Sequence, residues 1–101
     1  PVRDTLKRQA PIVDAQSATV SETVTRAGLW RALTPQMFRR GALSAALSAA
    51  NARGAMATDE AQAMEWAGVT PVLVEGAEDN IKVTTTHDLA LARFLLREQQ
   101  A

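Results

Sequence analysis

Four short polar stretches interrupt an otherwise apolar, alanine-rich chain, and they hold the side chains best suited to chemistry. Each stretch places a hydroxyl, a cation or the start of a helix beside a turn. Such groups favour negative charge, because they present N–H or O–H donors or a positive charge to it. The pattern therefore predicts an anion-binding site. The stretches are the arginine island Arg26–Trp30, the proline island Leu33–Gln36, the helix-start island Thr58–Ala61 and the lysine island Asn80–Thr84.

One side chain in each island is a candidate for that site. Thr58 would offer a hydroxyl and free backbone N–H groups at a helix start. Lys82, inside a short apolar strand, could hold a phosphate or lie on the surface with its stem against apolar neighbours. Thr34 could face a ligand at the carboxyl edge of a sheet, or could simply form a turn. Arg26 could bind a phosphate through two N–H groups, or could be a solvated charge.

Other kinds of site are disfavoured by spacing. His87 has no second histidine or cysteine as a co-ligand, which argues against a metal site. The serines lack the sequence context of a nucleophile. Asp59 and Glu60 are adjacent in a helix and therefore point apart, as first-turn acids commonly do. The glycines, at positions 28, 41, 54, 68 and 76, are too far apart for a phosphate-binding glycine loop.

The composition fits one small domain without an overall preference for a charged partner. The chain has 101 residues, 47% of them hydrophobic, and its 11 basic residues balance its 11 acidic ones. This balance gives no reason to expect binding to nucleic acid or to anionic lipid. No apolar run approaches the roughly 20 residues of a membrane span, there is no signal-peptide pattern, and cysteine is absent. We expect a soluble, cytoplasmic protein, and we expect a longer parent chain because Pro1 opens directly into a strand pattern.

The element order predicts an α/β fold. Residues 2–8 alternate roughly between apolar and polar, and residues 18–25, after a loop with Pro11 and Asp14, are β-branched at most positions with few apolar side chains. They predict a two-stranded ribbon, which either covers a partner surface or is a mobile hairpin, because it has too few apolar residues for its own core. Thr58 is expected to cap the second helix, which ends at Gly68. The remaining expected elements are a strand at 29–33, a helix at 37–53, strands at 71–75 and 80–83, and a helix at 88–98 capped by Thr85 or Thr86.

In order and spacing, the islands and their neighbours resemble the C-terminal half of the methylerythritol phosphate cytidylyltransferases, enzymes of non-mevalonate isoprenoid biosynthesis. The resemblance covers essentially the whole chain. It implies the C-terminal half of a Rossmann-like nucleotidyltransferase sheet, with residues 1–26 as a protruding β-ribbon arm and 27–101 as the α/β body of the same domain. Besides the four islands, it is carried by Pro1-Val2-x-Asp4-Thr5-Leu6-Lys7, Val74-Glu75-Gly76 and Asp88-Leu89-Ala90-Leu91-Ala92.

The resemblance also implies a reaction and roles for five residues. A phosphate oxygen of methylerythritol phosphate would attack the α-phosphorus of CTP, giving a cytidine diphospho-alcohol and pyrophosphate, with magnesium on the nucleotide. Arg26 and Lys82 would position the attacking phosphate. Thr34 and Thr58 would help to hold the substrate from the body. Thr5, like Arg26, would reach it from the arm of the partner subunit in a homodimer.

Two small departures and one larger one separate this chain from the complete pattern. The loop from Gln9 to Ser17 is longer than in common members, and Thr86-His87 replaces a common Pro-Glu pair. The family's glycine-rich CTP loop and magnesium-binding aspartate belong to an N-terminal half that these residues do not include, so we expect the chain alone to be inactive. The alternatives are a ribitol phosphate cytidylyltransferase, which shares related motifs, and a non-catalytic module for dimerisation or sugar-phosphate binding.

Overall fold

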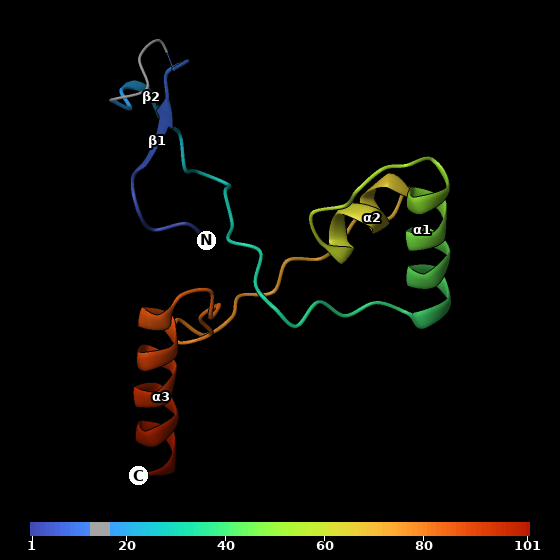
Figure 1. Cartoon of the computed structure of the whole chain (residues 1–101). Coiled ribbons are helices and arrows are strands. Elements are labelled where there is room, and N and C mark those ends of the chain that lie inside the picture. The colour runs from blue at the N-terminus through green and yellow to red at the C-terminus, as the bar shows by residue number, and fades with distance from the viewer. Residues whose placement is uncertain (13–16) are drawn as a thin grey trace. The chain divides into compact units, whose positions relative to one another are not determined.

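The computed structural model describes residues 1–12 and 17–101, so the expected loop residue Asp14 lies outside the described part. Within that part the chain is an α/β fragment with one two-stranded sheet and three helices. It divides into two compact units, Pro1–Ala32 and Leu33–Ala101. The first unit contains β1 and β2 and the second contains the helices (Figure 1). The elements are β1 Leu6–Gln9, β2 Val20–Val24, α1 Arg40–Ala52, α2 Glu60–Trp66 and α3 Thr86–Gln100.

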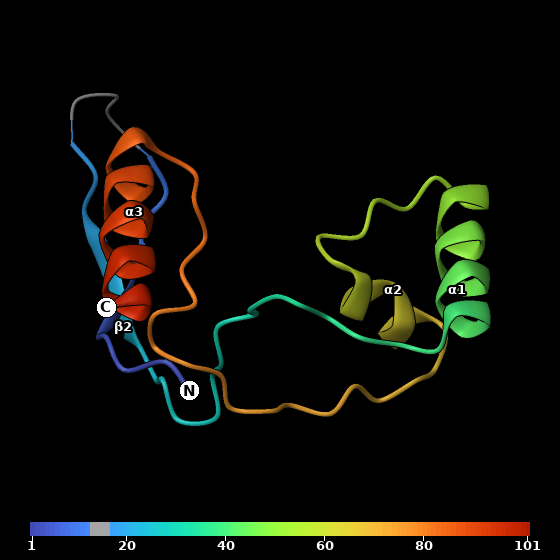
Figure 2. The ribbon, with the colours of Figure 1, turned by 90° about the horizontal axis from the view of Figure 1, so that it is seen from below.

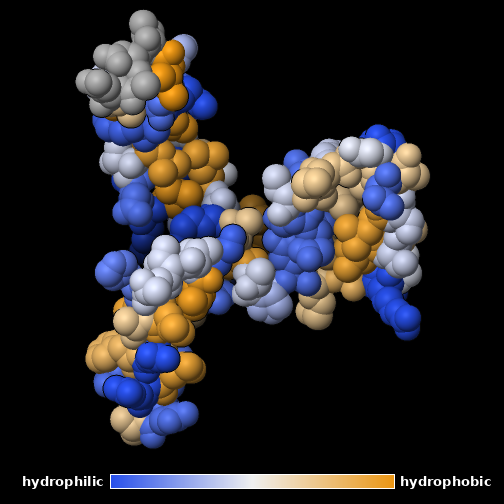
Figure 3. All heavy atoms as spheres, viewed as in Figure 1, coloured by the Kyte–Doolittle hydropathy of each residue, from blue (hydrophilic) through white to orange (hydrophobic). Residues whose placement is uncertain are grey.

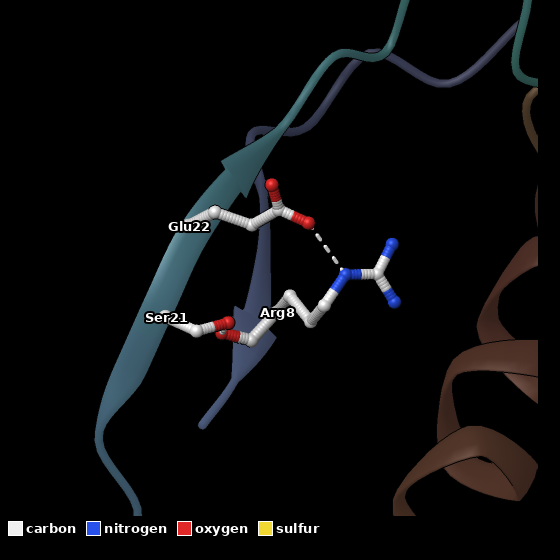
Figure 4. Close-up of polar contacts among 3 residues, drawn as sticks. All are labelled: Arg8, Ser21 and Glu22. Atoms are coloured by element: carbon white, nitrogen blue, oxygen red, sulfur yellow. Dashed lines mark hydrogen bonds and ion pairs between the residues drawn. The ribbon is translucent and has the colours of Figure 1, made fainter. Parts of the chain in front are cut away.

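The predicted ribbon is confirmed as an antiparallel pair held mainly by polar contacts. Leu6 pairs with Val24 and Arg8 with Glu22, and the register shifts at the next pair. At this bulge the Ser21 hydroxyl donates to the Arg8 carbonyl at 3.2 Å, and Arg8 Nε donates to Glu22 Oε1 at 2.6 Å (Figure 4). No strand residue is fully buried. The ribbon therefore has defined pairing but no hydrophobic core of its own.

Helices α1 and α2 pack against each other in both ribbon views (Figures 1 and 2). Helix α1 confirms the helix expected at 37–53, with a later start, and Gly54 follows it with a φ of +67° that suits glycine. Gly68, after α2, has a φ of +85° and matches the predicted stop. The helix–helix contact is the core of this unit. It consists of buried Ala46, Ala63 and Met64, with Phe38, Leu43 and Ala57 packed around them.

A capping box begins α3, which confirms one of the two predicted caps. The Thr85 hydroxyl accepts the Asp88 N–H at 3.2 Å, and the Asp88 carboxylate accepts the Thr85 N–H at 2.8 Å. This reciprocal pair satisfies two donors that a helix start would otherwise leave unpaired. It starts the helix two residues before the predicted Asp88, and the helix continues two residues past the predicted Glu98.

The three strands expected at 29–33, 71–75 and 80–83 are not formed, so this part of the prediction is wrong for the structure described. Their residues have extended or irregular backbone without ladder pairing to any described segment. Val72 and Val74, in the run expected to be buried on both faces, are 86% and 83% exposed. A strand exists only when a neighbour supplies hydrogen bonds. The apolar run at 71–75 favours a strand, but it would form one only beside neighbouring strands. The three expected segments do not pair with one another to provide them.

Apolar side chains are exposed on α3 as well as on the extended segments. Leu89, Leu91, Phe94 and Leu96 are between 43% and 57% exposed. Figure 3 shows orange patches on the surface of the part that contains α3. None of the described helices combines the length and the apolarity that crossing a membrane requires.

Candidate functional site

Two predicted site residues, Thr5 and Arg26, come to the same end of the ribbon. Thr5 directly precedes β1 and Arg26 follows β2 by two residues, and the pairing of Leu6 with Val24 places both at the end where the strand pair begins. Both side chains are exposed. The Arg26 guanidinium donates through Nη1 to the carbonyl oxygen of Arg3. This contact anchors one side of a group with five N–H donors, so further donors remain for an anion.

The other three predicted residues lie in the helical unit, where Gln36 joins two of the islands. Its amide Nε2 donates to Asp59 Oδ2 at 2.9 Å, and its Oε1 accepts the Ala61 N–H at 3.0 Å. Both contacts are partly buried. The proline island, with Thr34, is thereby attached to the start of α2, beside Thr58.

Asn80 joins the lysine island to the proline island. Its Nδ2 donates to the carbonyl oxygen of Thr34 at 2.6 Å. Leu33 of the proline island also lies close to Gly76, which precedes the lysine island. A Cβ added to Gly76 would lie 3.2 Å from Leu33 Cδ1. The segment that carries Lys82 therefore runs beside the proline island, although the two do not pair as strands.

The start of α2 differs from the prediction in one residue. Asp59, and not Thr58, is the N-cap, and its Oδ1 accepts the Gln62 N–H at 2.8 Å. The Thr58 N–H and hydroxyl both donate to Gln62 Oε1, at 2.7 and 3.1 Å. Aspartate and threonine are both good caps, and the longer carboxylate also accepts from Gln36. The free N–H groups expected at Thr58 are thus occupied by side chains of this chain.

Thr34 and Lys82 contrast with Thr58 in the availability of their side-chain donors. Both are exposed, and among residues 1–12 and 17–101 the Thr34 hydroxyl and the Lys82 ammonium have no hydrogen-bond or ion-pair partner. Such donors are available to an anion without breaking an internal contact. The structure thus brings Thr34, Thr58 and Lys82 into one connected set of segments, and it brings Thr5 together with Arg26 in the other unit.

Two connecting residues, Gln36 and Asn80, were not singled out by the sequence analysis. Both are neutral amides, which neither titrate nor carry a charge, so their residue type alone does not indicate a functional role. Their partners lie 23 to 46 residues away along the chain. Their presence inside two islands was the only available signal.

The clearest electrostatic perturbation lies outside the islands' candidates, at the start of α3. Hydrogen bonds from the backbone N–H groups of Thr84 and Thr85 lower the pKa of Asp88 to about 2, with smaller contributions from the two hydroxyls. These bonds favour the charged carboxylate. The residue acts in capping the helix. Among the described residues no group of three or more histidine, cysteine, aspartate or glutamate side chains could hold a metal ion.

Comparison with known proteins gives a family match over almost the full length. The family model "IspD: 2-C-methyl-D-erythritol 4-phosphate cytidylyltransferase" matches residues 1–98. A protein of that name from Vibrio vulnificus is 52% identical over 100 residues, which are 99% of this chain and 40% of the relative. One from Salmonella arizonae is 54% identical over 96 residues, 95% of this chain and 39% of the relative. The chain thus spans about 40% of the length of the curated relatives it matches.

Solved structures agree in fold. The crystal structure of a 4-diphosphocytidyl-2C-methyl-D-erythritol synthase matches with a TM-score of 0.75 at 46% identity, covering 95% of this chain and 39% of that one. The structure of 2-C-methyl-D-erythritol 4-phosphate cytidylyltransferase from Thermus thermophilus matches with a TM-score of 0.80 at 35% identity, covering 96% of this chain and 45% of that one. At these identities the likeness covers sequence as well as backbone.

Proposed function

Because this chain belongs to the 2-C-methyl-D-erythritol 4-phosphate cytidylyltransferase family, we propose that it is part of a cytidylyltransferase. The complete protein would join CTP and methylerythritol phosphate in non-mevalonate isoprenoid biosynthesis. A phosphate oxygen attacks the α-phosphorus of CTP. The bond between the α-phosphorus and the oxygen that bridges to the β-phosphorus breaks, and pyrophosphate leaves. The family match over residues 1–98 carries this proposal. Since the chain spans 40% of its relatives, we expect it to be inactive alone.

Lys82 and Arg26 are proposed to position the attacking phosphate. Two cations beside it reduce its repulsion from the CTP phosphates and fix the line of attack, and positioning supplies most of the catalysis in transfers of this kind. The Lys82 ammonium has no partner among the described residues, which supports its role. The contact of Arg26 with the Arg3 carbonyl supports a fixed orientation for the guanidinium.

The three threonines are proposed to hold the substrate. Thr34 offers a hydroxyl that has no partner within the described part of the chain, and its carbonyl is bonded to Asn80 of the lysine island. Such a hydroxyl suits hydrogen bonding to a phosphate or a hydroxyl group. The Thr58 hydroxyl can donate to a phosphate only when its proton turns away from Gln62 Oε1, to which the Thr58 N–H also donates. Thr5 would act with Arg26 from the end of the ribbon.

We extend the proposal to architecture and assembly. The complete domain would be a Rossmann-like nucleotidyltransferase sheet, in which residues 1–26 form the β-ribbon arm and 27–101 belong to the body. In a homodimer the arm would bring Arg26 and Thr5 to the substrate of the partner subunit. A ribbon with polar pairing and no core supports this role, because it needs a surface to cover. The cytoplasmic location stays a prediction.

Magnesium would accompany CTP and supply charge stabilisation on its phosphates. The described residues provide no cluster that fits the ion, so its ligands would come from CTP and from residues outside this chain. The contribution of the present residues is to bind and orient the sugar phosphate.

The alternatives are not favoured. The relatives described above bear the name of the methylerythritol phosphate enzyme, and they match up to 99% of the chain. Neither a ribitol phosphate enzyme nor a non-catalytic module has a comparable observation in its support.

A hybrid enzyme tests the proposal. This chain would replace the matching 100 residues of the Vibrio vulnificus relative. We expect magnesium-dependent release of pyrophosphate from CTP with methylerythritol phosphate and not with ribitol phosphate. Release with ribitol phosphate alone would indicate a ribitol phosphate cytidylyltransferase instead. A folded hybrid that releases no pyrophosphate with either substrate would favour the non-catalytic module.

The two cations are tested in the same hybrid. Arg26→Ala and Lys82→Ala should each lower turnover at least tenfold, about 1.4 kcal/mol of barrier. Arg97→Ala, which removes an exposed arginine from the last turn of α3, is the matched control and should retain activity. Near-normal rates for both island variants would contradict their assignment.

Assembly is tested by shortening the arm. A hybrid without residues 9–24 should change from a dimer to a monomer in light scattering. An unchanged dimer would contradict the role proposed for the ribbon.

A further inference from the structure

We propose that Gln36 and Asp59 form a positioning pair that sets the distance between Thr34 and Thr58 for the sugar phosphate. This inference rests on the proposed function, and it assigns the pair a role in substrate affinity that the family match does not supply. Neither side chain is proposed to contact the substrate. They act through the backbone segments that carry the two threonines.

The first support is that every amide and carboxylate position of the pair is used. Gln36 Oε1 accepts from Ala61 N–H and Nε2 donates to Asp59, whose two oxygens accept from Gln62 N–H and from Gln36. A backbone N–H can only donate and a carboxylate can only accept, so the orientation of the Gln36 amide is fixed by its partners. A reversed amide would face donor to donor and acceptor to acceptor.

The second support is the place of the pair in the chain. Gln36 lies two residues after Thr34, and Asp59 lies directly after Thr58. The contacts of Gln36 cross 23 and 25 residues of sequence and are partly buried, where hydrogen bonds are less exposed to competition from water. Together with the bond from Asn80 to the Thr34 carbonyl, they fix the proline island from both sides.

The third support is the absence of regular structure that could do the same work. Residues 33–39 lie outside any helix or strand, as do residues 55–59. Backbone of that kind keeps its geometry only where side chains or neighbours hold it. Among the described residues, Gln36 supplies the side-chain hydrogen bonds between these segments, while Phe38 and Ala57 also pack against the α1–α2 core. Loss of the hydrogen bonds should therefore let the threonines move apart without dismantling that core.

A donor–acceptor reversal in the hybrid enzyme tests the pair. In Gln36→Glu two carboxylates face each other, and in Asp59→Asn two amide NH₂ groups do. We expect each single variant to raise the KM for methylerythritol phosphate about tenfold, with kcat changed less than threefold. In the double variant the carboxylate introduced at position 36 can accept from both Ala61 N–H and the amide introduced at position 59. The oxygen of that amide still caps Gln62, so KM should return to within threefold of the unsubstituted hybrid.

The matched control is Gln99→Glu. Gln99 also donates from Nε2 to an aspartate, Asp79, at 3.1 Å, but it lies on α3 outside the islands. This variant should leave KM unchanged. A purely structural role for Gln36 would instead lower the midpoint of thermal unfolding without separating KM from kcat.

Several results would overturn the pairing. They are a normal KM in Gln36→Glu, a double variant no better than the worse single variant, or an equal rise in Gln99→Glu. An inactive unsubstituted hybrid would contradict the proposed function and leave the pairing to a second measurement, hydrogen exchange of the peptide containing residues 58–62. That exchange should accelerate in both single variants and slow again in the double variant, and a failure to do so would reject the pair independently of turnover.

Discussion

Truncation of Met64 tests whether one small cluster holds α1 and α2 together. Its side chain is 3% exposed and packs with Ala46 and Ala63. Replacing a buried methionine with alanine costs about 2–5 kcal/mol, and the lower end applies here because few large side chains surround the site and it can partly collapse. A loss of about 2 kcal/mol increases the open population of the helix pair roughly 30-fold.

Hydrogen exchange followed by mass spectrometry measures that population segment by segment. In Met64→Ala, protection of the amides of α1 and α2 should fall about 30-fold, whereas the amides of β1 and β2, which belong to the other compact unit, should not change. Met56→Ala removes the same atoms from a side chain that is 91% exposed, so it should shift protection by no more than about twofold. Equal losses in the two variants, or a loss below threefold in Met64→Ala, would refute the idea that this cluster stabilises the pair.

Three further predictions concern the helices. Gly68→Ala should destabilise α2 by about 1–2 kcal/mol in urea unfolding, because φ at this position is +85° and is strained for any residue with a Cβ, although no neighbouring atom is in the way. Gly41→Ala, inside α1 with equally open space, should stabilise by about 0.5–1 kcal/mol. Changes of the same sign in the two variants would contradict this. Arg53→Ala should cost about 0.5–1 kcal/mol, since its guanidinium lies 4.7 Å from the centre of the Trp66 ring, and an unchanged urea midpoint would show the stacking to be without effect. The side-chain carboxyl of Asp88 should titrate in NMR at about pH 2, below its ordinary 3.8. Because this pKa is lowered by folding, the stabilisation of α3 is complete above about pH 3.8 and disappears as the pH falls through about 2, so a carboxyl titrating near 3.8 would disprove the capping box.

The sequence was sufficient for elements whose signals are local. The helix starts and stops follow from neighbouring residues, such as the Thr85 cap and the glycines after α1 and α2, and these predictions were correct to within about three residues. The cap of α2 was wrong by one position because Thr58 and Asp59 are both suitable residue types. The choice between them depends on Gln36, which is distant in sequence.

The strands show where local signals fail. The run from Pro71 to Glu75 has the composition of a buried strand, yet Val72 and Val74 are almost fully exposed. Composition indicates which environment a segment favours, while a ladder requires a neighbour with matching register. Only the ribbon meets both conditions within the described residues, because its two strands are close in sequence and pair with each other.

The candidate site divides in the same way, and the division explains what sequence reasoning can find. Thr34, Thr58 and Lys82 could be named as candidates from the sequence because hydroxyls and ammonium groups can bind anions wherever they lie. Gln36 was not found, because an amide becomes informative only when its partners are known, and those partners fix both of its ends. A residue that binds a ligand needs at least one available donor or acceptor, whereas a residue that positions others acts through the partners it already holds. Within the islands, the state of the donors therefore separates binding candidates such as Lys82 from positioning residues such as Gln36, and it marks Thr58, whose donors are both on Gln62, as the binding assignment that most needs a test.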